Sequence, residues 1–181
     1  PDYVFHCAAL PRVPRSLEAP IETHEVNVNG TLNVLEAARH SGVKRVIYSA
    51  SSSAYGLQTE LPSKEDMKCY PLSPYGLQKY IGEYYCWQYA RHFGLDTVSL
   101  RYFNVIGKRA PQEGAYCLVL GVFLRQRSSN EVLTIFGDGQ QTRDYTPVDD
   151  IVRGNILAME REEDFNGEII NLGTGKETSV N

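Results

Sequence analysis

Apolar runs of strand length alternate with helix-like segments along this chain, and that alternation constrains the fold more than any other feature. The runs 3–9, 45–50 and 97–102 predict buried strands. The segments 20–40 and 75–93 carry apolar residues at helical spacing. Strands joined by helices pair in parallel through right-handed crossovers. We therefore expect an α/β fold with a doubly wound parallel sheet.

The carboxyl-terminal part of the chain is less regular. We expect helices near 118–125 and over 148–161, and strands over 132–136 and 168–172. The two prolines of segment 10–16 predict a loop there. The last helix and strand are expected to return to the main sheet.

Glycine-rich turns are the usual sign of a dinucleotide or phosphate site, and here they are incomplete. Gly137-Asp138-Gly139 lacks a third glycine, and Gly173-Thr174-Gly175-Lys176 lacks the earlier glycine of a P-loop. Both predict turns. We expect a sheet that is truncated at both ends, with strand 3–9 as an exposed edge.

A tyrosine and a lysine follow a helix start that has good capping residues. Ser73 is a favoured N-cap, and Pro74 suits the first helical position. Tyr75 and Lys79 then lie one turn apart on the same face. A nearby ammonium favours the phenolate, so it would lower the pKa of Tyr75 from about 10 and make the residue a general base. The alternative is that Lys79 only covers the ring.

Hydroxyl side chains at the end of strand 45–50 add a second element of chemistry. Ligands of doubly wound sheets bind beyond the carboxyl ends of the strands. His6, Ser51 and Asn104 follow such ends, so we expect them to converge on one crevice. A plain polar strand end at Ser51, a turn residue at Asn104 and a satisfied core histidine at His6 are the alternatives.

Composition excludes several classes of function. The formal net charge is −4 and no run of Lys and Arg occurs, so a nucleic acid is not an expected partner. No apolar stretch is long enough to span a bilayer. The four cysteines have no metal spacing, which predicts no metal site and a cytoplasmic compartment. Cys7 and Cys117 lie in apolar runs and are expected to be buried thiols.

Six motifs together point to one protein family. In chain order they are HCAALPRVPRSLEAP, NVNGTLNVLEAAR, SASSSAYG, LSPYGLQKY, LRYFNVIG and LTIFGDGQQTRDY. The chain resembles, over essentially its whole length, the extended branch of the short-chain dehydrogenases/reductases, the NAD-dependent sugar-nucleotide epimerases and dehydratases. The resemblance implies a Rossmann-type NAD-binding region over 1–104, without its glycine-loop strands, and an incomplete substrate-binding region with a returning helix and strand over 105–181.

The resemblance also implies roles for individual residues. The catalytic residues would be Ser51, Tyr75 and Lys79. Those that bind NAD would be Cys7, Ala8, Ala9, Leu10, Pro11, Asn27, Ser51, Tyr75, Lys79 and Phe103. Those that bind the sugar nucleotide would be Ser51, Ser52, Ser53, Tyr75, Asn104, Val119, Thr134, Phe136 and Arg143. For Arg143, a surface ion pair with Asp144 or Asp150 is the alternative to a diphosphate contact.

The serine run separates the subclasses of this family. Dehydratases typically carry an Asp-Glu pair where Ser52 and Ser53 stand, so the resemblance favours a 4-epimerase of UDP-glucose or UDP-N-acetylglucosamine. Pro11-Arg12 stands where the enzymes that act on N-acetylated sugars would have smaller residues. Gly121 stands where the family usually has Pro. A dehydratase, dehydrogenase or reductase is the alternative enzyme, and a non-catalytic dinucleotide-sensing protein is the alternative of another class.

The resemblance further implies an oligomer. In this family, helices corresponding to 20–40 and 75–93 usually pair with those of a second subunit, which predicts a homodimer.

Overall fold

A computed structural model describes residues 1–111 and 117–181. Within these ranges the main sheet has four strands, all parallel to their neighbours. In spatial order they are β1 (Tyr3–His6), β2 (Arg45–Ser51), β3 (Asp96–Tyr102) and β7 (Glu168–Leu172). This confirms the predicted α/β fold with its parallel sheet.

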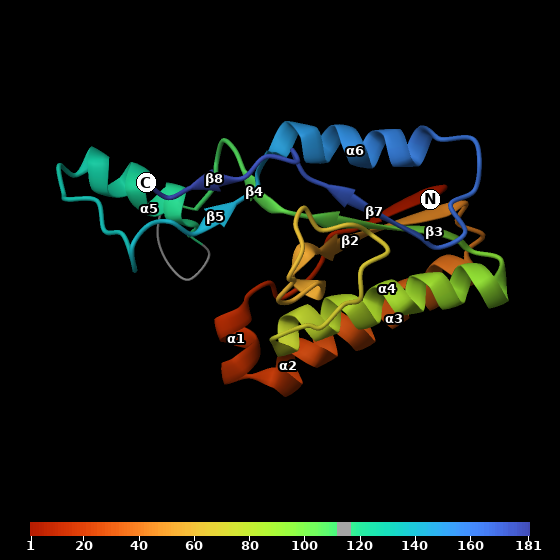
Figure 1. The fold of residues 1–181 in the computed structure, drawn as a ribbon. Helices are drawn as coiled ribbons and strands as arrows, with labels where there is room; N and C mark the ends of the chain where they lie inside the picture. Colours follow the sequence, from red (N-terminus) through yellow and green to blue (C-terminus); the bar gives the residue numbers. More distant parts are fainter. Residues whose placement is uncertain (112–116) are drawn as a thin grey trace.

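Helices cover both faces of the sheet (Figure 1). On one face lie α3 (Gly30–His40) and α4 (Pro74–Phe93), and on the other lies α6 (Val148–Glu160). Every side chain of β2 is buried, because alternate residues point to opposite faces. Tyr48 packs with the α3 and α4 side, and Ile47 with the α6 side. The apolar run of β2 is continuous because both faces of the strand are buried.

The long helix predicted over 20–40 is present but contains a wide turn. It consists of α2 (Pro20–His24), a π-helical turn η1 (Glu25–Asn29) and then α3. The Gly30 N–H donates to the Glu25 carbonyl, a bond that encloses one more residue than an α-helical bond.

The loop predicted over 10–16 is only partly correct. Residues Val13–Glu18 form a short helix, α1. Pro14 stands in its first turn, where a missing N–H leaves no bond unmade. The proline therefore begins a helix at this position.

Shorter elements follow at the carboxyl ends of the main strands. They are η2 (Ser52–Ala54), β4 (Asn104–Ile106), α5 (Val119–Ser128), β5 (Thr142–Arg143), β6 (Tyr145–Pro147) and β8 (Thr178–Ser179). Strand β4 pairs in parallel with β6, and β5 pairs antiparallel with β8. These two small ladders stand beyond the end of the main sheet (Figure 1).

The strand predicted over 132–136 is wrong. Val132 is 88% exposed and Phe136 is 82% exposed, and the segment has no strand assignment. Thr134 instead bonds Gln126 of α5 through its N–H and its hydroxyl, at 3.0 and 2.9 Å. An apolar run becomes a strand only where a neighbouring backbone completes its ladder.

Strand β1 lies at one edge of the sheet and is shorter than the predicted 3–9. Its side chains Tyr3 and Phe5 are 37% and 42% exposed. The expected exposed first strand is therefore confirmed. Within the described ranges, no helix is both long and apolar enough to cross a membrane.

Candidate active site

Ser51 and Tyr75 are brought together by a strand end and a helix start. Ser51 is the last residue of β2, and its Oγ accepts a hydrogen bond from the Ser53 N–H at 3.2 Å. Helix α4 is capped by Ser73, whose Oγ accepts from the Gly76 N–H at 3.1 Å. Ser16 of α1 adds a second cap, because its Oγ accepts from the Tyr75 N–H at 3.0 Å. The predicted capping of this helix is confirmed.

Gly76 allows the start of α4 to approach the serine run closely. A Cβ on Gly76 would lie 2.6 Å from the carbonyl oxygen of Ser53, so any larger residue would push the helix away. The close approach brings the Tyr75 hydroxyl near enough to Ser51 for the serine to influence its pKa. Burial raises the pKa of Tyr75 above its ordinary value, and Ser51 opposes that effect.

Lys79 lies behind this pair, buried beneath the sheet end. It is 4% exposed, and its Nζ donates to the carbonyl oxygen of Ser49 at 2.8 Å. Burial lowers the pKa of Lys79 to about 8. In this structure the influence that opposes burial at Tyr75 comes from Ser51, and the effect of Lys79 on the pKa of Tyr75 stays a prediction.

Asn27 differs most from its predicted role as a cofactor contact. It is 1% exposed and lies in the π turn η1. Its Oδ1 accepts from the Leu10 N–H at 2.7 Å, and its Nδ2 donates to the Leu10 carbonyl at 3.1 Å and to Gln78 Oε1 of α4 at 2.9 Å. Asn27 thus fixes the loop after β1 against the helix that carries Tyr75, and it presents no free polar atom to a ligand.

The loop after β1 exposes small side chains beside Lys79. Cys7 and Ala8 are exposed, and the Ser49 hydroxyl donates to Cys7 Sγ at 3.2 Å. The prediction of a buried Cys7 is wrong, and Cys117 is only half-buried; Cys86 is the fully buried thiol. His6 is a satisfied core residue, as the alternative reading held, because its Nε2 shares a 2.9 Å hydrogen bond with Thr31. Burial lowers the pKa of His6 to about 4.

A cavity of about 750 Å³ opens at the carboxyl ends of β2, β3 and β7. It brings together five of the predicted site residues: Ser52, Ser53, Phe103, Asn104 and Arg143. The predicted substrate residues Ser51, Tyr75, Val119, Thr134 and Phe136 do not line it. Ser51 and Tyr75 lie at the end of β2 and the start of α4, and the other three lie on α5 and on the segment that follows α5. A Cβ on Gly121 of α5 would lie 2.5 Å from the Pro111 carbonyl, so close packing accounts for glycine there.

Asn104 and Arg143 reach the cavity from the two small ladders. The Asn104 Nδ2 donates to the Asp144 carbonyl at 3.3 Å, so this residue is more than a turn former. The Arg143 Nη1 donates to the Thr142 carbonyl at 2.7 Å, and the side chain is exposed. Among the described residues Arg143 forms no ion pair with Asp144 or Asp150, so its charge is available to the cavity.

Sequence reasoning missed a hydrogen-bonded network on the other wall of the cavity. The Tyr55 hydroxyl donates to Asn171 Oδ1 at 2.7 Å, and the Asn171 Nδ2 donates to the Ser63 carbonyl at 3.0 Å. Arg101 stacks over the Tyr55 ring at 4.4 Å and pairs with Glu83 of α4. The sequence signal for the Arg101–Glu83 pair was a charged residue within an apolar strand and another within a helix, because charged side chains are rarely buried without a partner.

In the part of the chain that the structure describes, no cluster of three metal-ligating side chains occurs.

Comparisons with known proteins agree with this geometry. The UDP-N-acetylglucosamine 4-epimerase of Methanobrevibacter ruminantium, solved with UDP-N-acetylmuramic acid, is 37% identical, with a TM-score of 0.95 over 99% of this chain and 57% of that chain. The UDP-glucose 4-epimerase of Thermotoga maritima, solved with UDP-glucose, is 41% identical, with a TM-score of 0.93 over 99% and 58%. A UDP-N-acetyl-alpha-D-glucosaminuronate decarboxylase of Bacillus cytotoxicus is 40% identical over 99% of this chain and 56% of its own length.

The chain thus spans a little over half the length of these relatives. A family model matches residues 1–173, from β1 through the end of β7. With this match over nearly its whole length, the chain belongs to the NAD dependent epimerase/dehydratase family.

Proposed function

We propose that the protein containing this chain is an NAD-dependent UDP-sugar 4-epimerase. The observation that carries the proposal is the approach of Ser51 at the end of β2 to Tyr75 at the start of α4, close enough for the serine to lower the pKa of the tyrosine. Ser52 and Ser53, which follow Ser51 directly, line the cavity. The relatives with solved structures include 4-epimerases bound to UDP-sugars.

The residues around β1 fit a dinucleotide cofactor. Cys7 and Ala8 have small side chains and are exposed at the carboxyl end of the strand. Lys79, buried beside them, supplies a cationic donor at the same place. When bound, NAD+ supplies the acceptor for the hydrogen on C4 of the sugar. The loop Cys7–Pro11 and Lys79 would hold it there, and Asn27 would fix the loop from behind.

Proton transfer falls to Tyr75 and Ser51. Tyr75 as phenolate removes the proton of the sugar 4-hydroxyl, while Ser51 holds that oxygen and stabilises the phenolate. For inversion, the cavity would have to let the sugar present either face of C4 to the bound cofactor. Arg143 would bind the diphosphate, for which a guanidinium fork is suited.

The choice of a 4-epimerase over a dehydratase depends on the acids of the site. Elimination of water needs an acid near the sugar, and Ser52 and Ser53 stand where the dehydratases carry theirs. Glu65, Asp144 and Glu177 also line the cavity. Glu65 accepts a hydrogen bond from the Asn171 N–H, Asp144 accepts from the Thr174 and Gly175 N–H groups, and Glu177 accepts from the Thr142 hydroxyl. Each of these carboxylates thus already has a structural hydrogen-bond donor.

The first experiment is product analysis with the protein expressed at the full length of its gene. With UDP-glucose or UDP-N-acetylglucosamine we expect reversible inversion at C4 and an unchanged mass. Loss of water in the mass spectrum would show a dehydratase, and steady accumulation of NADH would show a dehydrogenase. Binding of NAD without turnover of either sugar would favour a dinucleotide-sensing protein.

We expect Ser51→Ala to shift the pH dependence of turnover. Ser51 lowers the pKa of Tyr75, so loss of its hydroxyl should raise that pKa further and reduce the phenolate fraction at neutral pH. The ascending limb of a plot of kcat against pH should move to higher pH. Ser63→Ala, a change at the cavity wall away from Tyr75, is the matched control. An unmoved profile for Ser51→Ala would remove the serine from the proton transfer.

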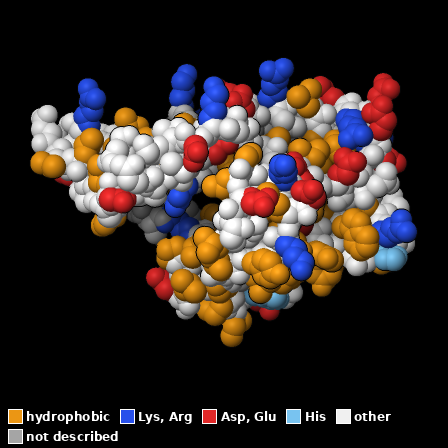
Figure 2. Space-filling model, in the orientation of Figure 1, with side chains coloured by type: hydrophobic (Ala, Val, Ile, Leu, Met, Phe, Trp, Pro, Cys, Tyr) orange, Lys and Arg blue, Asp and Glu red, His pale blue; other side chains and the backbone are white. Residues whose placement is uncertain are grey.

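We further propose a cytoplasmic homodimer that acts without nucleic acid or membrane partners, with its cofactor region over 1–104 and its substrate region over 105–181. Support for a dimer comes from α4, which exposes Leu77, Tyr84, Trp87 and Phe93 by 42% to 55%. Figure 2 shows apolar side chains gathered over the lower helices of this view. Support for the compartment comes from the four cysteines, all of which are free thiols.

A further inference from the structure

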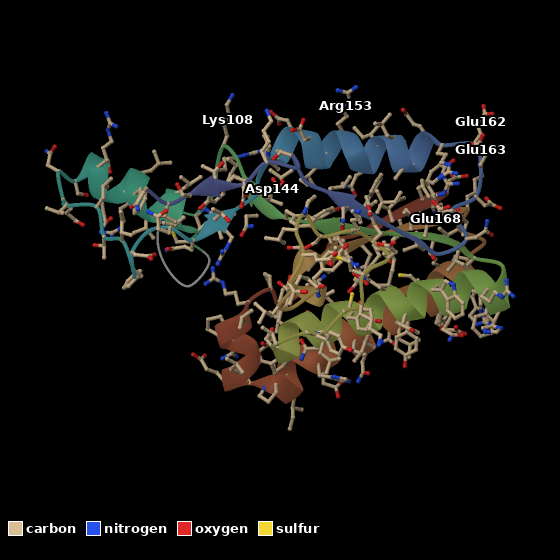
Figure 3. The ribbon with its side chains drawn as sticks, in the orientation of Figure 1. Lys108, Asp144, Arg153, Glu162, Glu163 and Glu168 are labelled. Atoms are coloured by element: carbon tan, nitrogen blue, oxygen red, sulfur yellow. The ribbon has the colours of Figure 1, made fainter. Side chains whose placement is uncertain are left out.

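Asp144 stands at the junction of the two small ladders, between β5 and β6 (Figure 3). Its carboxylate accepts two hydrogen bonds from Thr174, at 3.1 Å from the N–H and 2.7 Å from the hydroxyl. It also accepts from the Gly175 N–H at 2.8 Å and from the Thr146 hydroxyl at 3.2 Å. One side chain thus holds the turn between β7 and β8.

The same residue connects this turn to the predicted sugar-nucleotide residues. Its backbone carbonyl accepts from the Asn104 Nδ2 at 3.3 Å. A Cβ on Gly173 would lie 2.8 Å from the Asp144 carboxylate and 3.2 Å from the Phe103 ring. Only a glycine lets the turn sit this close to both. Asp144 therefore fixes two walls of the cavity relative to each other.

The hydrogen bonds around the Asp144 carboxylate favour its ionised form. Burial acts to raise the pKa of Asp144, but the bonds from Thr174, Gly175 and Thr146 outweigh it, so the pKa is lowered below its ordinary value. The carboxylate stays ionised at neutral pH, and its bonds to N–H groups are charge-assisted.

A second carboxylate holds the strand that leads into the turn. Glu65 Oε1 accepts from the Asn171 N–H at 2.8 Å, where β7 approaches its end. Gly173, Gly175 and Lys176 of the turn line the cavity, and so does Arg143 of β5. The N–H groups of residues 174–176 are already bonded within the turn, so they are not free for a ligand. Lys176 and Arg143 supply the cationic side chains of this part of the cavity, beside the carboxylates of Glu65 and Glu177, and cationic side chains are suited to phosphate oxygens.

We propose that Asp144 is a positioning residue for the sugar nucleotide: it holds the turn 173–176 as the diphosphate-facing wall of the cavity. The inference rests on the function proposed above. Asp144 acts through the turn and through Asn104, and does not touch the reacting atoms. Strand β7 is held separately by its pairing with β3 from Glu168 to Leu172, so loss of the carboxylate frees the turn and leaves the sheet intact.

The test is Asp144→Asn in the protein at the full length of its gene. The amide keeps the size but loses the charge and places a donor among donors. We expect KM for the UDP-sugar, and Kd for UDP by calorimetry, to rise about tenfold. We expect kcat to stay within about twofold, with NAD content and Tm unchanged. Glu162→Gln, an exposed carboxylate after α6 and far from Asp144 in Figure 3, should change none of these.

Thr174→Val is a milder second variant that removes one hydroxyl donor. Its KM should rise about threefold. The double variant Asp144→Asn/Thr174→Val should have the same KM as Asp144→Asn, since both changes break the same contact between residues 144 and 174. UDP affinity and KM within twofold of wild type for Asp144→Asn, or a fall in kcat at constant KM, would overturn the proposal. If Asp144→Asn fails to fold, an unchanged KM in Thr174→Val overturns it instead. A wild-type protein that binds UDP but turns over no sugar would refute the epimerase assignment alone. The effect of Asp144→Asn on the Kd for UDP would still test whether Asp144 positions the turn.

Discussion

Tyr75→Phe should lower turnover at least about a hundredfold while leaving the fold intact, which is the scale of a lost general base. The change removes only the hydroxyl whose pKa Ser51 influences. The caps of α4 come from Ser73 and Ser16 and address backbone N–H groups, so they survive the substitution. The ring keeps its packing at the helix start.

The measurement is kcat for UDP-sugar inversion, with Tm and NAD content as checks on folding. Tyr84→Phe, the same chemical change on the exposed face of α4, is the matched control and should leave kcat unchanged. Turnover within a few fold of wild type in Tyr75→Phe would eliminate Tyr75 as the base.

Glu83→Gln should reduce the free energy of unfolding by about 3 kcal/mol, because it leaves a buried guanidinium without its counter-charge. Glu83 and Arg101 are each 1% exposed. Their paired bonds measure 2.9 and 2.7 Å, and they join α4 to β3 in the interior. The Arg101 Nη1 has no hydrogen-bond partner among the described residues, so the environment offers little compensation.

Urea denaturation with an unchanged m-value would measure this loss. Glu168→Gln is the control, since its 3.3 Å contact with Arg161 is at the surface and should contribute less than about 1 kcal/mol. A loss below about 1 kcal/mol in Glu83→Gln would mean that the interior solvates Arg101 by other means.

The sequence pattern predicted the main sheet and its helices because these elements are defined by burial. Strand β2 is buried on both faces, so its apolar run is continuous, and α4 begins at its capping serine. The pattern failed where a local signal depended on a distant partner. Segment 132–136 has strand-like residues but no backbone to pair with, and Pro14 begins a helix that packs on α4.

The candidate site divides in the same way. Ser51 and Tyr75 could be predicted because a strand end and a helix cap place them. The contacts of Asn27 and Asp144 could not be predicted, because their partners are distant in sequence. The partners of Asn27 lie 17 and 51 residues away, and those of Asp144 lie 30 and 40 residues away. The pKa of Tyr75 could not be predicted either, since spacing to Lys79 carries no information on burial.

The π turn at Glu25–Asn29 sets the rotational phase of the long helix. Before the turn, Thr23 faces α4 and accepts a hydrogen bond from Gln78 at 3.0 Å; after it, Thr31 faces β1 and bonds His6. One residue corresponds to about 100° of rotation in an α-helix. Removing one residue from the π turn would therefore rotate one half of the helix relative to the other, so that Thr23 and Thr31 could not both keep their contacts. The π turn thus lets one continuous helix direct Thr23 to α4 and Thr31 to β1.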